Sequence, residues 1–274
     1  MPAILRTTSV RPTPAAAGHL LRLRRILDAD GRTAILPLDH AITFGPRGGL
    51  ESASAVVDVA RRAGFNAVML RPGLVPAVLD VDTRDLGLIL CVTGRLDRGV
   101  DHVLLSSVEA AAASGADAVC AEFKLGSEGE LANAQVVSRV AEEAHQMGLP
   151  VLVTVYALPD IVARSGADAH VHACRVAEEL GADLVKTGLP DDDALVRRCV
   201  EATTVPVVVA GGTADGTGAL VERVARAVAA GAAGAAVGRS IWGADDPYDV
   251  AVRVRHAVAG DVTATRPLAR DGVA

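Results

Sequence analysis

The chain has 274 residues, of which 27 are basic and 33 acidic, so its formal net charge is −6. Half of the residues are hydrophobic, which fits a globular protein with a large core and excludes a disordered chain. The mild acidity and the aromatic share of 2% argue against a nucleic-acid partner, which needs basic surfaces or stacking rings. The sequence has no apolar run of the roughly 18 residues that a membrane span needs, so we expect no membrane partner.

The cysteines indicate the compartment. Cys91, Cys120, Cys174 and Cys199 form no CxxC pair, which disfavours a zinc cage or a thioredoxin-like motif. Their largely apolar or helical surroundings are typical of buried free thiols in a reducing compartment. Residues 1–18 contain basic residues but lack the apolar stretch of a signal peptide. We therefore expect a cytoplasmic protein.

The chain is expected to form one domain over residues 19–260, between a flexible head (residues 1–18) and a flexible tail (residues 261–274). A first helix is predicted at residues 20–26, where it would cover the bottom of a barrel. Short apolar runs, typical of strands buried on both faces, then alternate with amphipathic helical stretches. The predicted strands are residues 34–38, 67–70, 88–92, 118–123, 151–156, 184–186, 207–210 and 235–237. The predicted helices are residues 52–63, 130–147, 169–180, 192–202, 219–230 and 247–259.

This alternation sets the fold class. Glycine follows several of the predicted helices and precedes a strand, which is the usual signal for a helix end. About eight strand–helix units predict a single α/β domain, a (β/α)8 TIM barrel with an extra N-terminal helix. An open, doubly wound sheet is the alternative. It is less favoured because no GxGxxG motif follows the first strand.

Lysine is rare in this chain. Only Lys124 and Lys186 occur, against 25 arginines. Arginine can supply positive charge, but it stays protonated and cannot act as an amine nucleophile. Both lysines fall at the carboxyl ends of predicted strands, where a (β/α)8 barrel carries its working residues. The two retained lysines are therefore candidates for chemistry.

Lys186 is the candidate nucleophile. Burial at the end of an apolar strand disfavours the charged form of an amine, and a neutral amine can attack a ketone to form a Schiff base. Asp39 and Tyr156, at the ends of other predicted strands, can supply a proton relay. The alternatives are a structural ion pair of Lys186 with Asp39 or Glu122, and a core role for Tyr156.

Glycines at the last two strand ends predict an anion site. Gly211 and Gly212 follow one strand, and Gly238 and Arg239 follow the next. Backbone amides in such turns, together with an arginine, can hold a phosphate at the usual phosphate position of a barrel. Ordinary tight turns are the alternative.

Four further residues at strand ends are expected to contact substrate. Alternation along the strand puts Glu122 and Lys124 on the same face, pointing into the barrel. A buried amine needs a partner, which for Lys124 is either a substrate phosphate or carboxylate, or an ion pair with Glu122 or Asp39. His40 and Arg71 lie at the ends of the first two strands.

Several motifs resemble one enzyme family in order. Residues 38–50, LDHAITFGPRGGL, are similar to the "DHG…GP…GL" opening of the archaeal-type class I aldolases, the DhnA-like branch of the DeoC/LacD aldolases. The motifs that follow in order are Ser107-Val-Glu-Ala, Leu125-Gly-Ser, Val185-Lys-Thr, Val209-Ala-Gly-Gly and Ala236-Val-Gly-Arg. The resemblance covers about residues 22–259. It implies that Lys186 forms the Schiff base and that Asp39 and Tyr156 take the family's catalytic positions.

The resemblance also implies a reaction class. The branch includes fructose-bisphosphate aldolases, heptulosonate-type synthases, a relative that joins dihydroxyacetone phosphate to aspartate semialdehyde, and a thiolase. We therefore expect a lyase or synthase acting on a phosphorylated ketone and an aldehyde, most simply a heptulosonate-type synthase. Fructose-bisphosphate aldolase, a thiolase or acyltransferase, and a non-catalytic phosphosugar-binding barrel are the alternatives. A homo-oligomer is expected, and no metal or other cofactor, because the iminium is itself the electron sink.

The chain departs from the family at the barrel mouth. It has Arg71-Pro72-Gly73 where His-Lys-Gly is common, and Glu122 and Lys124 where His and Asn are common. Ala157 follows the tyrosine in place of the start of a Pro-Arg-Gly. These positions would contact substrate, so the departures disfavour fructose-bisphosphate cleavage. They also suggest that Lys124 supplies the positive charge that the family carries after its second strand.

Overall fold

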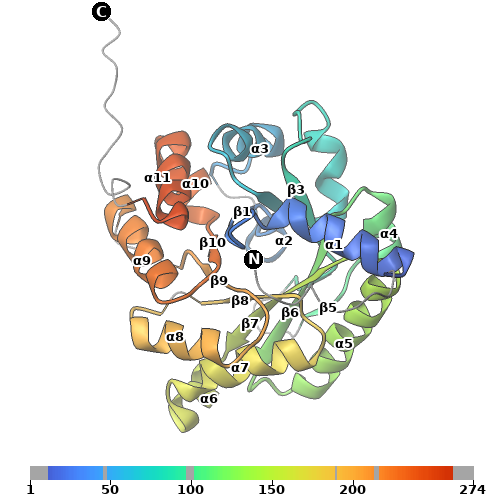
Figure 1. Cartoon of the computed structure of the whole chain (residues 1–274), viewed down its shortest axis with the longest axis vertical. Helices are drawn as coiled ribbons and strands as arrows, with labels where there is room; N and C mark the ends of the chain where they lie inside the picture. The colour runs from blue at the N-terminus through green and yellow to red at the C-terminus, as the bar shows by residue number, and fades with distance from the viewer. Residues whose placement is uncertain (1–11, 46–47, 97–101, 189, 213–215, 262–274) are drawn as a thin grey trace, which may run out of the picture.

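A barrel forms the centre of the molecule. The computed structural model describes residues 12–45, 48–96, 102–188, 190–212 and 216–261. Within these residues, eight parallel strands close in the order β1-β10-β9-β8-β7-β6-β3-β2, with helices around them (Figure 1). The strands are β1 (Thr33–Pro37), β2 (Ala67–Leu70), β3 (Gly87–Cys91), β6 (Ala118–Leu125), β7 (Val151–Ala157), β8 (Leu184–Thr187), β9 (Val207–Ala210) and β10 (Gly234–Ala236). Because β1 pairs with β10, the predicted (β/α)8 barrel is confirmed and the open sheet is excluded.

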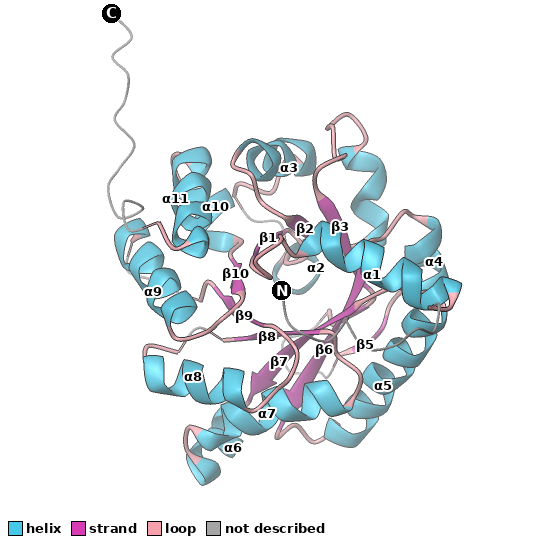
Figure 2. Ribbon diagram, in the orientation of Figure 1, coloured by secondary structure: helices cyan, strands magenta, loops and turns pink. Residues whose placement is uncertain are grey.

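Helices form the outer ring (Figure 2). The predicted ones correspond to α1 (Pro14–Ile26), α3 (Ala53–Arg62), α5 (Glu130–Gln146), α7 (Asp168–Glu179), α8 (Asp193–Glu201), α9 (Thr217–Ala229) and α11 (Pro247–Ala259). Five short helices were not predicted: α2 (Ala41–Phe44), the 3-10 helix η2 (Pro72–Val78), α4 (Val108–Ala113), α6 (Pro159–Ser165) and α10 (Arg239–Trp242). An antiparallel pair, β4 (Thr93–Gly94) and β5 (Val103–Leu104), was not predicted either. These elements are short, so they carry little periodicity.

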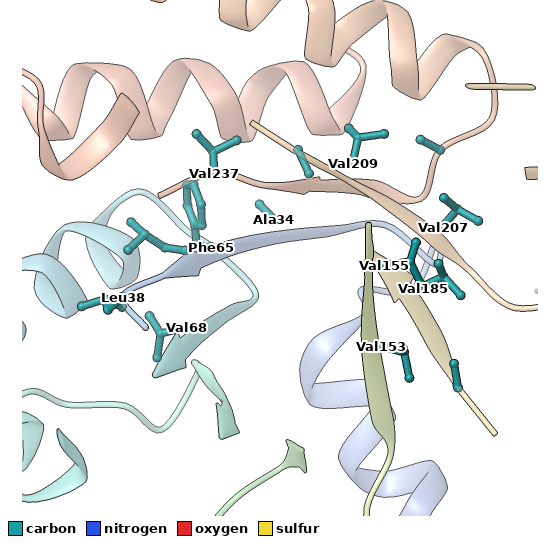
Figure 3. Close-up of a cluster of buried hydrophobic side chains, with 14 of the residues drawn as sticks. Ala34, Leu38, Phe65, Val68, Val153, Val155, Val185, Val207, Val209 and Val237 are labelled. Atoms are coloured by element: carbon teal, nitrogen blue, oxygen red, sulfur yellow. The ribbon is translucent and has the colours of Figure 1, made fainter. Parts of the chain in front are cut away.

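The strands bury apolar side chains on both faces. One set, which includes Val153, Val185 and Val209, packs against the helices (Figure 3). The alternate positions, such as Leu152 and Leu184, form a second cluster inside the barrel. Side chains alternate along a strand, so every second residue after Leu152 and Leu184 also points into the barrel. These next inward-facing residues of β7 and β8 lie at the carboxyl end of the barrel.

Helix α1 covers the opposite end of the barrel. Its Ile26 packs within the interior cluster, and the helix crosses the near face of the barrel in Figure 1. Arg25 forms an ion pair of 2.7 Å with Asp117, just before β6, and Arg22 donates to the carbonyl of Gly148, before β7. The carboxyl ends of the strands lie at the other end of the barrel, away from α1.

The start of α1 corrects the predicted boundary of the head. Residues 14–18, expected to be flexible, are helical. Thr13 caps the helix by accepting from the amide of Ala16, and Pro14 suits the first turn. The carbonyl of Ala15 also lies so close to Gly148 that a side chain there would collide with it. The Thr13 cap and the contact with Gly148 thus stabilise the first turn of the helix. The alanine-rich sequence there has little apolar periodicity, so the helix start could not be predicted from it.

The predictions about the chain ends, the cysteines and membrane spans have different outcomes. Residues 1–11 of the predicted head and 262–274 of the predicted tail lie outside the described residues. All four cysteines are buried and free of disulfides, as predicted. Among the helices of the described residues, none combines the length and the apolarity needed to cross a bilayer.

Candidate active site

The strand register brings inward-facing polar residues together at the carboxyl end of the barrel. Glu122 on β6 lies opposite Thr154 on β7, which in turn lies opposite Lys186 on β8. One step nearer the mouth, Lys124 lies opposite Tyr156. The polar residues therefore occupy two adjacent levels above the apolar interior.

Strand β6 reaches beyond its neighbour β3, so its last residues need other hydrogen-bond partners. The ladder between β3 and β6 ends at Cys91 and Cys120. Beyond it, the hydroxyl of Thr93 accepts from the amide of Glu122. The fully buried side chain of Asn133 donates to the carbonyl of Glu122 and accepts from the amide of Lys124, both at 3.0 Å. Asn133 thus holds the strand segment that carries both candidate residues.

Glu122 is the centre of a polar network. Its Oε1 accepts from the hydroxyl of Tyr156 at 3.2 Å, and its Oε2 lies 2.9 Å from Nε2 of His102. The His102 ring is buried and stacks on the Tyr156 ring at 6.1 Å. His102 was not predicted, because no sequence pattern links it to Glu122.

The environment of Tyr156 favours its protonated form. Desolvation at the barrel end, and the negative charges of Glu122 and Asp39, raise its pKa well above the ordinary value. The residue as a whole is nevertheless 43% exposed, so it borders the mouth of the barrel. The hydroxyl of Tyr156 therefore stays protonated at neutral pH, and the exposure of the residue argues against a purely core role.

Lys186 is buried without an ion pair. Its side chain is 8% exposed, and among the described residues no carboxylate lies within 4.0 Å of the amine and no hydrogen bond holds it. The two oxygens of Glu122 are instead occupied by His102 and Tyr156. The structural ion pair considered for Lys186 is therefore absent from the described part of the chain, and the amine remains available for a substrate.

Asp39 and His40 supply two unsatisfied polar atoms. Oδ1 of Asp39 and Nδ1 of His40 lie 3.5 Å apart, and both are buried without a hydrogen-bond partner among the described residues. Burial lowers the pKa of His40; the charge of Asp39 opposes this effect, whereas the charge of Lys186 reinforces it. His40 also packs edge-on against Trp242. A buried polar atom without a partner is costly, so these atoms suit a polar group of a ligand.

Arg71 lies against β4. Its Nη1 donates to the carbonyl of Thr93 at 2.7 Å, and its guanidinium covers Gly94 so closely that a side chain there would collide with it. Its Nε is buried without a hydrogen-bond partner among the described residues. Arg71 is thus partly anchored by the fold.

The two glycine turns lie at adjacent strands, β9 and β10. Gly212 has φ of 62°, a backbone conformation that favours glycine. A side chain at Gly238 would lie 2.6 Å from the carbonyl oxygen of Pro37, so only glycine fits there. The amides of Gly212 and Gly238 donate to no carbonyl within the described residues, and Arg239 begins α10 beside them. The turn of Gly211 packs against Val237.

Comparison with known proteins decides the family. Residues 33–244 match the model of the "DeoC/LacD family aldolase". The chain belongs to the DeoC/LacD aldolase family. It is 34% identical over 260 residues to a 2-amino-3,7-dideoxy-D-threo-hept-6-ulosonate synthase of Halobacterium salinarum, covering 94% of this chain and 97% of that protein.

Two further relatives support this assignment. A 2-amino-4,5-dihydroxy-6-oxo-7-(phosphonooxy)heptanoate synthase of Streptomyces griseus is 34% identical, over 83% of this chain and 85% of that protein. A solved archaeal fructose-1,6-bisphosphate aldolase is 27% identical with a TM-score of 0.79, covering 88% of this chain and 100% of that chain. In that structure the catalytic lysine is covalently bound to the carbinolamine intermediate of the substrate. This DeoC/LacD aldolase is thus an enzyme of the class I aldolase type, as its sequence predicted.

Proposed function

We propose that this enzyme is a heptulosonate-type synthase that joins a ketose phosphate or dihydroxyacetone phosphate donor to an aldehyde such as aspartate semialdehyde. The names of the two sequence relatives support this reaction, since both are synthases of seven-carbon amino-keto acids. The buried amine of Lys186, free of ion pairs within the described residues, is the observation on which the proposal depends.

The amine of Lys186 begins the reaction. It attacks the ketone carbonyl of the donor and forms a carbinolamine, which loses water to give an iminium. The iminium withdraws electrons from the neighbouring carbon. With dihydroxyacetone phosphate a proton leaves that carbon, whereas with a ketose phosphate the bond to the next, hydroxyl-bearing carbon breaks and an aldehyde leaves; both routes give a nucleophilic enamine. The enamine carbon attacks the aldehyde, the new C–C bond forms, and the aldehyde oxygen takes up a proton. Hydrolysis of the product iminium restores the free amine.

Tyr156 and Glu122 move the protons in this scheme. The hydroxyl of Tyr156 donates to Glu122, and Glu122 also contacts His102, so the three side chains form a chain along which a proton can pass. The buried carboxylate oxygen of Asp39 orients the reacting hydroxyl and the amine. His102 also holds the carboxylate of Glu122 in position through its 2.9 Å contact.

The anion site holds the donor phosphate. Gly212 and Gly238 contribute amides that have no other acceptor within the described residues, Gly211 supports the turn, and Arg239 adds positive charge. Lys124, on the side of the barrel that carries Tyr156, binds the second anionic group of the substrate pair. His40 and Arg71 border the same mouth and contact the acceptor.

Fructose-bisphosphate aldolase is the second candidate, because the solved relative has that activity. It is less favoured because both sequence relatives named above are heptulosonate-type synthases at higher identity. The two functions differ in acceptor. A synthase uses an aldehyde that bears an amino acid group, whereas the aldolase uses glyceraldehyde phosphate.

Borohydride trapping tests both the nucleophile and the substrate. Borohydride reduces the iminium to a stable amine, so a trapped ketose phosphate adds its mass to a lysine peptide. The chain has only two lysines, so Lys124→Arg is a matched control for Lys186→Arg. We expect the wild type and Lys124→Arg to be labelled at Lys186, and Lys186→Arg to remain unlabelled. Labelling of Lys186→Arg would refute the assignment.

The choice of acceptor is tested in the same samples. Product formation from donor and aspartate semialdehyde, with little cleavage of fructose bisphosphate, is the expected result. Efficient cleavage of fructose bisphosphate would support the second candidate. Labelling at Lys186 without any turnover would indicate a phosphosugar-binding barrel, and acyl transfer without labelling would indicate a thiolase. The expected cytoplasmic location and homo-oligomeric state stay predictions, and light scattering of the purified protein checks the latter.

A further inference from the structure

A cluster of two histidines and an aspartate lies at the closed end of the barrel. His19 is on α1, His145 is in the last turn of α5, and Asp183 precedes β8. The histidine rings are 5.6 Å apart at their centroids. Among the described residues, this is a group of three side chains whose potential metal-ligand atoms all lie within 4.8 Å of one another. We propose that His19, His145 and Asp183 bind one divalent transition-metal ion such as Zn²⁺.

The spacing of the ligand atoms suits such an ion. Nε2 of His19 lies 3.2 Å from Oδ1 of Asp183, and Nε2 of His145 lies 2.9 Å from Oδ2. Metal–ligand bonds of about 2.0–2.1 Å at tetrahedral angles place ligand atoms about 3.3 Å apart. Each histidine nitrogen is thus within a few tenths of an ångström of this separation from one carboxylate oxygen, and all the potential ligand atoms lie within 4.8 Å of one another. Rotation of the half-buried His19 ring and the exposed His145 ring would bring both nitrogens onto one ion.

The chemistry of the ligand set also suits a metal. The amide of Val151 donates to Oδ2 at 2.8 Å and fixes the orientation of the carboxylate, as partners of metal ligands commonly do. Two imidazoles and one carboxylate form a ligand set that binds Zn²⁺ and leaves a position for water.

The site would be structural rather than catalytic. Asp183 precedes β8 and Lys186 is three residues further along, so roughly 10 Å of strand separates the metal from the proposed nucleophile. The ion would connect three elements that are distant in sequence: α1, α5 and the start of β8. It would hold α1 in place over the end of the barrel, in addition to the contacts of Arg22 and Arg25.

The competing interpretation is a metal-free ion-pair cluster, in which both histidines simply contact the carboxylate. The two are separated by titrating Zn²⁺ and then Co²⁺ into tag-free, full-length protein treated with a chelator. Bound metal is quantified after gel filtration, and thermal unfolding is recorded with and without metal. The tetrahedral Co²⁺ absorption in the visible range reports the ligand geometry.

We expect one bound ion per chain and a higher Tm with metal. His145→Gln and His19→Gln should each lose the bound ion and the Tm increase. His172→Gln, which changes an exposed histidine of α7, should keep both and serves as the matched control. Because 41% of the His145 side chain is exposed, its variant is expected to fold, and borohydride labelling at Lys186 confirms the folded barrel. No ion retained by the wild type, or equal retention by wild type and both histidine variants, would overturn the proposal.

Discussion

Replacing Tyr156 with phenylalanine tests the proton relay, because it removes one hydroxyl and leaves the ring. Losing a positioned acid–base group costs about 10²–10⁴-fold in rate, which corresponds to about 2.7–5.5 kcal/mol of transition-state stabilisation. The loss of stability should be smaller. The hydroxyl makes one 3.2 Å hydrogen bond to Glu122, which keeps its contact with His102, and the residue as a whole is 43% exposed. We therefore expect the free energy of unfolding to fall by about 1.5 kcal/mol, the low end of the range for a hydrogen bond to a charged group.

The assay compares turnover, trapping and melting of the same preparation. Turnover should fall by two orders of magnitude or more, while borohydride still labels Lys186, because the amine is intact. The Tm should fall by only about 3–6 °C for a domain of this size. The chain has one other tyrosine, Tyr248, which lies under the guanidinium of Arg62 on the outside of the barrel. Tyr248→Phe is thus the matched control, with unchanged turnover. If Tyr156→Phe turns over like the wild type, the relay as described is wrong.

Three further substitutions probe the rest of the site. Lys124→Met should raise KM by the equivalent of about 1.5–3 kcal/mol at nearly unchanged Tm, whereas a large drop in Tm at unchanged KM would make the lysine structural. Asn133→Ala removes both hydrogen bonds that hold the end of β6, so we expect a loss of about 1–3 kcal/mol by chemical denaturation together with reduced turnover. Stability within 0.5 kcal/mol of wild type would contradict that role. Gly238→Ala places a methyl group 2.6 Å from the Pro37 carbonyl oxygen. The phosphate concentration needed to protect the folded state to the same degree should therefore increase at least tenfold. Equal protection would argue against a phosphate at that turn.

The strands were predictable because a parallel barrel buries both of their faces. Residues 67–70 and 207–210 were predicted as strands and match β2 and β9. The largest strand difference is β6, predicted to end at residue 123 but extending to Leu125. Glu122 and Lys124 interrupt the apolar run, yet both continue the strand because Thr93 and Asn133 supply hydrogen bonds that the sheet lacks there. Such side-chain partners come from other elements and leave no local pattern.

The candidate site was predictable where its residues follow strands directly. Lys186 and Tyr156 were located from strand ends alone, and the structure places both at the carboxyl end of the barrel. His102 was missed because its contact with Glu122 joins a loop to a strand some 20 residues away. The partner of Glu122 was also missed, since alternation suggested Lys124 and did not indicate a histidine from outside the strand. Loops bring such groups together only in the folded chain.

The closure of the barrel has a consequence for how the chain folds during synthesis. Strand β1 pairs with β10, so Thr33 finds its partner Gly234 only after nearly all of the barrel has been made. Helix α1 likewise docks against Asp117, Gly148 and Asp183, which leave the ribosome much later than the helix itself. Contacts of such high sequence separation form slowly because a long loop must close first. A nascent chain that stalls before β10 therefore exposes an unpaired edge of β1 and an uncovered apolar face of α1, and both are sites at which chaperones or aggregation compete with folding.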